Sequence, residues 1–532
     1  MDTWAPDENP ILIRHVHTRL QRGGALVTAG IVAIACLGIL VVGSMIADNN
    51  RTPPEQAARV MFFVVLAVPG ILLLFGGAHR VSLAISMERA SGVLETLRLT
   101  PMHPGVGLAG YLLGPPLQEI VASLAAIPFL AYCVLRGGVP FVEAFQYAVT
   151  IGMTALLFYL MAAVSALSGA AGQPQKRSGV AIGFFVLVFV LPNLIGVTGV
   201  LARGGTGDGA SPTFFGVGLP LFFHTLIWQG FLIAFLAIGA ARKLAREGAP
   251  ALSKRQAVSF YAVLHVLLLG TTWEWLMRTS RLAVGTGGPI SAFSGWLIGM
   301  SIAGGLLGMW LVSLMVPAPL AYLRELERAR ARSAAPRAWS EGASQVRWGL
   351  ARAGISAAYL LVPVALLLGS GTPPAAIDWE IALLPLLLAA VILHVGASRE
   401  ALTLRYRKHG GSVHLLLQTA LWLLPPILGS IVGVAGNHPL AGGLIASPSP
   451  VAGFAAALES IRGDARSLFG PTPGVAAIAS LGVQIAFAVL CLQRLRHVHR
   501  RIAEHGLYRA TPPPAEDPGA PAARLDAHPP FC

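Results

Sequence analysis

The sequence predicts an all-α polytopic membrane protein with about 12 transmembrane helices in two parallel six-helix halves. Apolar residues make up 55% of the 532-residue chain and charged residues only 12%, against roughly 25% charged residues in a soluble domain. The apolar residues form runs of about 20, the length that crosses the hydrocarbon core of a bilayer. Basic residues gather between alternate pairs of runs, as the positive-inside rule predicts.

Each predicted span is an apolar run of 18 or more residues. The first half has runs near residues 25–46, 60–78, 108–135, 144–169, 180–201 and 220–241, and the second half near residues 257–277, 293–320, 349–369, 379–397, 413–434 and 473–493. With a cytoplasmic amino end, 30 of the 38 Lys and Arg residues fall on the cytoplasmic side. We therefore expect both termini in the cytoplasm and the chain in a bacterial plasma (inner) membrane.

The polar segments divide the chain into four parts. We expect a cytoplasmic interfacial helix over residues 1–24, the first six-span half over 25–250, the second half over 251–505, and a disordered Pro-rich cytoplasmic tail over 506–532. The tail has almost nothing apolar to bury. No polar segment reaches the ~50 residues at which soluble domains begin, so no soluble catalytic domain is expected.

Both halves start on the same side of the membrane, so an internal duplication would be a parallel one. Residues 189–196 read FVLPNLIG and residues 422–429 read WLLPPILG. An outside loop with a Ser-Pro pair is expected after each, at Ser211-Pro212 and Ser449-Pro450, followed by a last span and a basic cluster. Chance similarity between Leu-rich spans is the alternative explanation.

The sequence motifs of several common enzyme classes are absent from the chain. None of the four Lys residues follows a Gly, so there is no phosphate-binding loop. Cys36, Cys133 and Cys491 lie in apolar runs and Cys532 is the last residue, a pattern that predicts neither a disulfide nor a metal site. We expect a chain that is not an enzyme and has no cofactor or metal. The net charge of +14 is explained by topology, so the expected partner is the lipid bilayer and not nucleic acid.

Polar side chains inside spans are functional candidates because they are costly to bury in a bilayer. The candidates for a translocation pathway are Glu119, His224, Gln229, His265, His394 and Gln484. The carboxylate of Glu119 has to be protonated, paired with another helix or placed in a wet cavity, unless it simply lies near the cytoplasmic face. For each histidine the alternative is a neutral ring bonded to a helix carbonyl.

Residues 87–101, MERASGVLETLRLTP, are predicted to form a short amphipathic helix after the second span. Leu94 and Leu97 share one face, and Glu95 and Arg98 have the i, i+3 spacing of an ion pair. We expect the apolar face to point to the cytosol, where a partner has to cover it. A helix lying on the lipid headgroups is the alternative.

The ends of this helix are also marked in the sequence. Ser91-Gly92 permits a bend or cap at its start, and Thr100-Pro101 stops it.

At these residues the chain resembles the permease subunits of type-2 ATP-binding-cassette (ABC) exporters. The positions that match the first cytoplasmic loop of that family are Glu88, Arg89, Gly92, Glu95, Leu97, Thr100 and Pro101. Asn9-Pro10 and the apolar and basic residues after it are similar to the interfacial connecting helix of the family. The resemblance covers residues 9 to about 250, and the second half matches in layout only.

The resemblance implies a tandem fusion of two permease halves, with a coupling helix over residues 87–101. The coupling residues would be Glu88, Arg89, Gly92, Leu94, Glu95, Leu97, Arg98 and Pro101. The helix would dock on a separate cytoplasmic ABC ATPase, with two ATPase subunits expected. ATP and Mg²⁺ would be bound by those subunits, and ATP-driven dimerisation would rock the spans. The matching loop of the second half, 324–347, is a basic run in which a solvated or lipid-facing segment is expected.

Two other classes of function stay open. A secondary transporter driven by an ion gradient also suits 12 spans in two parallel halves, with Glu119 or the span histidines as proton carriers. A membrane-bound enzyme or scaffold would gather polar residues at one depth, whereas the candidates here are spread over several spans. The sequence does not identify a substrate.

Overall fold

The structure is a computed structural model that describes residues 9–20, 23–168, 213–246, 249–286, 311, 345–369, 383–406, 410–436, 438–462 and 473–505. In this part of the chain nearly all residues are helical, and nine helices are long and apolar enough to cross a membrane. The chain is therefore an all-α polytopic membrane protein. The predicted span at 180–201 and the tail lie outside the described residues, as do the predicted span at 293–320 except residue 311 and the loop at 324–347 except residues 345–347.

The helices of the first half are α1 (Pro10–Leu20), α2 (Gly24–Asn49), α3 (Pro54–Ile71), the π-helix η2 (Leu72–Gly77), α4 (Ala78–Ala90), α5 (Val93–Leu99), α6 (Pro104–Leu113), α7 (Leu117–Leu124), α8 (Ile127–Gly137), α9 (Phe141–Ser168) and α12 (Leu221–Ala245). A small antiparallel hairpin of β1 (Thr213–Phe214) and β2 (Val217–Gly218) precedes α12, with Thr213 paired to Gly218. The second half contains α13 (Lys254–Thr286), α16 (Gln345–Gly369), α17 (Leu383–Tyr406), α18 (Gly410–Ser430), the π-helix η7 (Ile431–Ala435), α19 (Pro439–Ala446), α20 (Pro450–Arg462) and α21 (Pro473–His505).

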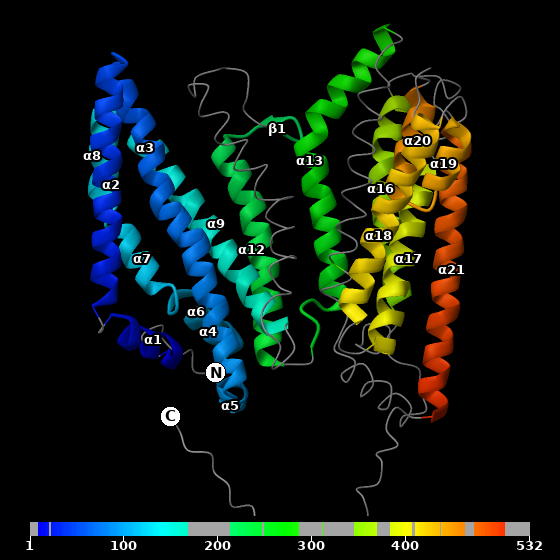
Figure 1. Ribbon diagram of the computed structural model, residues 1–532, viewed down its shortest axis with the longest axis horizontal. Helices are drawn as coiled ribbons and strands as arrows, with labels where there is room; N and C mark the ends of the chain where they lie inside the picture. Colours follow the sequence, from blue (N-terminus) through cyan, green and yellow to red (C-terminus); the bar gives the residue numbers. More distant parts are fainter. Residues whose placement is uncertain are drawn as a thin grey trace, which may run out of the picture.

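The long helices run roughly side by side between two ends of the molecule (Figure 1). Helix α1 lies across one end, beside the start of α2, and α5 lies at the same end. We call this the basal end and the opposite one, where β1 lies, the distal end. The two halves meet in the middle of the view, where α12 is followed by α13.

Two apolar clusters form most of the described core. One joins α4, α6, α9, α12 and α13 through buried residues such as Tyr111, Phe158 and Phe260. The other joins α13, α16, α17, α20 and α21 through residues such as Leu387 and Phe454. The two clusters share Leu268 of α13 as a partly buried neighbour, so α13 packs in both halves.

The second predicted span is longer than expected. Helices α3, η2 and α4 form one continuous rod over Pro54–Ala90, 37 residues long. At 1.5 Å per residue the rod is about 55 Å long, well beyond the roughly 30 Å of a hydrocarbon core. Its basal end therefore projects beyond the bilayer, and residues 87–90 belong to this rod and not to the short helix that follows.

The third predicted span, 108–135, is wrong in its first part. The chain bends after Leu113, and only Leu117–Gly137 has the length and composition of a span. Pro115 and Pro116 lie at the break, and each lacks the backbone N–H that a continuous helix needs. The preceding helix α6 packs on α1 and α12 at the basal end.

The predicted outside loop at Ser449-Pro450 is also wrong. Ser447 and Ser449 are buried, and Ser449 Oγ donates to the carbonyl of Trp422, halfway along α18, at 2.8 Å. Helices α19 and α20 therefore form a re-entrant hairpin that enters from the distal end and turns inside the bundle (Figure 1). The sequence suggested a loop because Ser-Pro pairs are common in turns, and the octapeptide at 189–196 and Ser211-Pro212 lie outside the described residues.

Candidate functional site

The candidate site at the basal end is built around a bend between α4 and α5. Helix α4 ends at Ala90, and Gly92 has a positive φ of 78°, a backbone conformation that glycine adopts without a steric penalty. Helix α5 ends at Leu99, and Thr100 is extended, as is usual before a proline. The predicted bend at Ser91-Gly92 and the predicted stop at Thr100-Pro101 are both confirmed.

Glu88 connects three helices at this bend. Its carboxylate, with a side chain 12% exposed, accepts hydrogen bonds from the guanidinium of Arg14 in α1 and from the hydroxyl of Tyr111 in α6. His15 Nε2 of α1 lies 3.8 Å away. Tyr111 lies in α6, outside the membrane-spanning helices. Burial raises the pKa of its phenol to about 12, an effect that Arg14 and Arg98 partly oppose, so the hydroxyl stays protonated and can donate.

Two arginines tie the bend to the ends of long helices. Arg89 Nη1 donates to the carbonyls of Ala166 and Leu167 at 3.3 and 3.4 Å, in the last turn of α9. Arg98 donates to the carbonyls of Leu244 and Lys243 at 3.0 and 3.3 Å, in the last turn of α12. The carbonyls of a last helical turn have no partner in their own helix, and the helix dipole favours a cation there.

Arg98 also forms the predicted i, i+3 pair within α5. Its Nη1 lies 2.5 Å from Glu95 Oε1. The Arg98 side chain is 9% exposed and that of Glu95 is 56% exposed. The guanidinium is thus held between α5 itself and the end of α12, which fixes the rotation of α5.

The expected exposure of the Leu94 and Leu97 face is wrong. Leu94 is fully buried, and Leu97 is partly buried and packs on the same core cluster as Leu94. The exposed apolar side chains at the bend are those of Met87 in α4 and of Val93 and Leu99 in α5, and Leu99 is 88% exposed. The i, i+3 pattern locates an apolar face correctly, but this face packs on the chain's own core.

The predicted pathway residue Glu119 is paired within the first half. It is buried, and its Oε1 accepts from Arg80 Nε of α4 at 3.1 Å. The next residue back, Gln118, donates to the carbonyl of Gly24 at the basal start of α2 at 3.0 Å. Glu119 is therefore paired with another helix, as one of its predicted alternatives states, and lies near the basal ends of the spans. Within the described part of the chain, its Oε2 and the Tyr159 hydroxyl are buried without a hydrogen-bond partner.

Three further predicted pathway residues each contact a different partner residue. His224 Nε2 lies 3.2 Å from Thr271 Oγ1, and Gln229 Nε2 donates to Thr154 Oγ1 at 2.8 Å. His265 Nδ1 lies 2.8 Å from the carbonyl of Tyr261, one turn earlier in α13. His265 is thus bonded to a helix carbonyl, which is the alternative foreseen for the span histidines.

The last two predicted pathway residues, His394 and Gln484, lie together. His394 Nδ1 is 3.1 Å from Gln484 Oε1, and both side chains are buried between α17 and α21. Helix α18 adds Gln418, whose Nε2 lies 3.5 Å from His394 Nε2 and 3.3 Å from Ser398 Oγ.

The same polar network continues to His414, whose Nδ1 lies 3.3 Å from Ser398 Oγ. Sequence reasoning missed Gln418, Ser398 and His414. Their spacing carried a signal, because His394 and Ser398 are four residues apart on α17, as are His414 and Gln418 on α18, and such pairs share one helix face.

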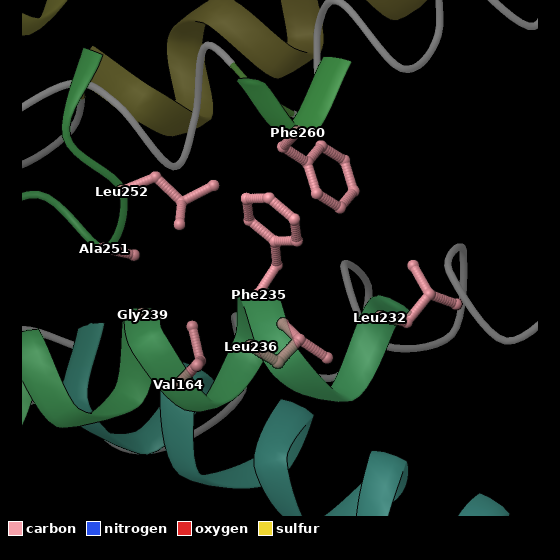
Figure 2. Close-up of a pocket in the computed structure, with 8 residues that line it drawn as sticks. All are labelled: Val164, Leu232, Phe235, Leu236, Gly239, Ala251, Leu252 and Phe260. Carbon is pink, nitrogen blue, oxygen red and sulfur yellow. The ribbon is translucent and has the colours of Figure 1, made fainter. Parts of the chain in front are cut away.

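An apolar pocket lies near the basal end between α9, α12 and α13 (Figure 2). It is lined by Val164, Leu232, Phe235, Leu236, Gly239, Ala251, Leu252 and Phe260. Figure 2 shows Phe235 of α12 pointing toward Phe260 of α13, and the two ring centroids are 4.8 Å apart. None of the predicted pathway residues lines this pocket.

Possible metal sites were sought among the described residues, and matches to known proteins were sought with the whole chain. Within the described ranges, no three His, Cys, Asp or Glu side chains are grouped so that they could hold a metal ion. Comparison of the chain with protein-family models, with curated proteins and with solved structures gives no match.

Proposed function

We propose that the chain is the membrane-spanning permease component of an ABC exporter, which moves its substrate with ATP hydrolysed by a separate ATPase subunit. The observation that carries the proposal is the arrangement at the basal bend. Helix α5 projects beyond the spans and leaves Leu99 exposed. Arg98 of α5 ties it to α12, and Glu88 and Arg89 at the end of α4 tie the bend before it to α1, α6 and α9.

This arrangement suits a helix that transmits a push. A short helix can move the spans as a rigid body only if it does not rotate or slide under load. Arg98 joins α5 to the end of α12, and Arg89 and Glu88 join the preceding end of α4 to α9 and α1. Movement of α5 would therefore be passed directly to the first half.

The exposed side of α5 offers a small contact surface for a partner. Val93 and Leu99 are its exposed apolar residues, and Glu95 and Thr96 lie beside them. Isolated apolar side chains are common on protein surfaces, but Leu99 at 88% exposure lies at the tip of a segment that extends away from lipid. In this proposal the ATPase covers these residues, in place of Leu94 and Leu97.

The proposal divides the chemistry between two chains. The ATPase subunits, of which we expect two, would bind ATP and Mg²⁺, because this sequence has no phosphate-binding loop. This chain would supply the spans and α5, with the basal end in the cytoplasm. Substrate would pass through the membrane part, and its chemical identity is not specified by this proposal.

The test starts with purification of the chain from native membranes with its bound partners. We expect an ATPase to co-purify and its activity to rise in the complex. Val93→Asp with Leu99→Asp should reduce that stimulation at least tenfold, because two carboxylates would replace the apolar contact at the centre of the interface.

Two controls make the result specific. Val217→Asp places the same charge at an exposed site at the distal end and should leave stimulation unchanged. Leu94→Asp should lower the amount of folded protein, since Leu94 is fully buried. Normal stimulation in the Val93/Leu99 double variant would contradict docking at α5, and transport by the purified chain in liposomes with a pH gradient and no ATPase would favour a secondary transporter.

A further inference from the structure

The tip of the re-entrant hairpin, residues 447–449, is held inside the bundle by hydrogen bonds from two spans. Ser449 Oγ donates to the carbonyl of Trp422 in α18 at 2.8 Å. From α21, Ser480 Oγ donates to the carbonyl of Ser449 at 3.4 Å, and Gln484 Nε2 donates to the carbonyl of Pro448 at 2.7 Å. These bonds supply partners for backbone groups that a bilayer cannot solvate.

The tip lies deep in the membrane part. Gln484 is 11 residues after the first residue of α21, Pro473, which corresponds to roughly 16 Å along the helix, about half the thickness of a hydrocarbon core. Ser449, Ser480 and Gln484 are all fully buried. The hairpin therefore ends in a dry environment near mid-depth, where a lost hydrogen bond is not replaced by water.

Both ends of the Gln484 amide are engaged. Its nitrogen donates to the hairpin tip, and its oxygen lies 3.1 Å from His394 Nδ1 of α17. An amide oxygen can only accept, so the proton of the His394 ring lies on Nδ1. Gln484 thus links the hairpin to α17 as well as to α21.

The hairpin also packs on α18 through backbone and apolar contacts. A Cβ at Gly442 of α19 would lie 2.5 Å from the carbonyl oxygen of Gly429, so the two helices approach backbone to backbone. Val451 of α20 packs on the apolar cluster that contains Trp422. Within this packing, the hydrogen bonds at the tip are directional and fix which backbone groups of the hairpin face α18 and α21.

We propose that Gln484 is a positioning residue that seats the hairpin α19–α20 at mid-depth and couples it to α17. Loss of its two hydrogen bonds loosens the tip without unfolding the spans. In the exporter cycle, and this step rests on the proposed function, the tether would make the distal hairpin follow α17 and α21 when the spans rock. The hydrogen bonds that hold the hairpin at this depth lie within this chain and do not depend on an ATPase.

The test measures access to the tip with a thiol reagent that does not cross membranes. Ser447→Cys is introduced after the four native cysteines have been replaced. Ser447 is buried, and its hydroxyl bonds only within α19, to Leu444, so the substitution leaves the seat intact. In membranes without ATPase, Gln484→Met, which keeps the length of the side chain but removes both hydrogen bonds, should speed labelling by about three- to tenfold.

Gln493→Met is the matched control, because Gln493 is exposed on the same helix, and it should not change the labelling rate. His394→Phe removes the link of Gln484 to α17 and the contact with Gln418, leaves the bond from Gln484 to Pro448 in place, and should give a smaller increase than Gln484→Met. An unchanged rate in Gln484→Met, in protein that reaches normal levels and labels fully after denaturation, would overturn the proposal. If Gln484→Met does not accumulate, His394→Phe decides, and an unchanged rate there overturns the coupling.

This experiment is independent of the ATPase. Faster labelling combined with no ATPase at all would support the tether and contradict the exporter. Unchanged labelling with normal ATPase stimulation would contradict the tether and support the exporter.

Discussion

Glu88 and Arg14 illustrate how unequal the two partners of one ion pair can be. The Glu88 side chain is 12% exposed and also accepts from the buried hydroxyl of Tyr111, whereas the Arg14 side chain is 44% exposed. Removal of the glutamate leaves a buried donor without a partner, but removal of the arginine leaves a carboxylate that keeps its bond to Tyr111. Charge alone does not predict which loss is worse.

We expect Glu88→Ala to cost roughly 2–3 kcal/mol of stability, as for an unsatisfied buried polar group. Arg14→Ala should cost about 1 kcal/mol or less, as for an exposed partner. The measurement is the midpoint of thermal unfolding in detergent. Glu95→Ala, at a side chain 56% exposed, serves as the control and should lie within about 0.5 kcal/mol of the wild type. Equal losses at Glu88 and Arg14 would contradict this account.

Helix α5 shows what its sequence could and could not predict. Gly92, Thr100 and Pro101 fix the ends of the helix through local backbone preferences, and the spacing of Glu95 and Arg98 predicts their pair. Local rules do not say what an apolar face packs against. Leu94 is buried in a cluster that also holds residues of α6, α9 and α12, and that cluster joins residues far apart in the chain.

The same limit explains the other differences at the level of elements. The break before Leu117 follows from two adjacent prolines. The prediction of one span over 108–135 relied on the number of apolar residues and gave these prolines too little weight. The re-entrant hairpin could not be predicted from Ser449-Pro450, because turn residues occur both in outside loops and in buried bends. Of the six predicted pathway residues, His394 and Gln484 are the pair that contact each other across two helices. The position of a residue in a span predicts its depth in the membrane but not the direction in which its side chain points.

Gly92 tests whether the bend between α4 and α5 is set by the backbone. A Cβ at Gly92 would meet nothing within 4 Å, so Gly92→Ala adds no clash and should destabilise only through its positive φ, by about 1–2 kcal/mol. Gly152→Ala in α9, where a Cβ also meets nothing, should be neutral or stabilising. Both are measured as thermal midpoints in detergent, with Gly92→Asn expected to lose less than Gly92→Ala. A neutral Gly92→Ala would mean that packing, and not the glycine, holds the bend.

The described helix ends carry their basic residues unevenly, which supports the proposed cytoplasmic basal end. At the basal end, α4 has Arg89 in its last turn, α5 has Arg98 and α12 has Arg242 and Lys243. At the distal end, α8 has Arg136 in its last turn. Positive charge is retained on the cytoplasmic side during insertion.

The side of the membrane on which α5 lies therefore decides between docking of a cytoplasmic ATPase and any other function of α5. In a background without the native cysteines, Val217→Cys at the exposed distal hairpin and Ser91→Cys at the exposed basal bend are treated with an impermeant thiol reagent on spheroplasts. We expect Val217→Cys to label at once and Ser91→Cys to label only after the membrane is permeabilised. A basal bend that labels from outside would place α5 where no ATP is available, and the contacts of Glu88, Arg89 and Arg98 would then need an explanation that involves no ATPase.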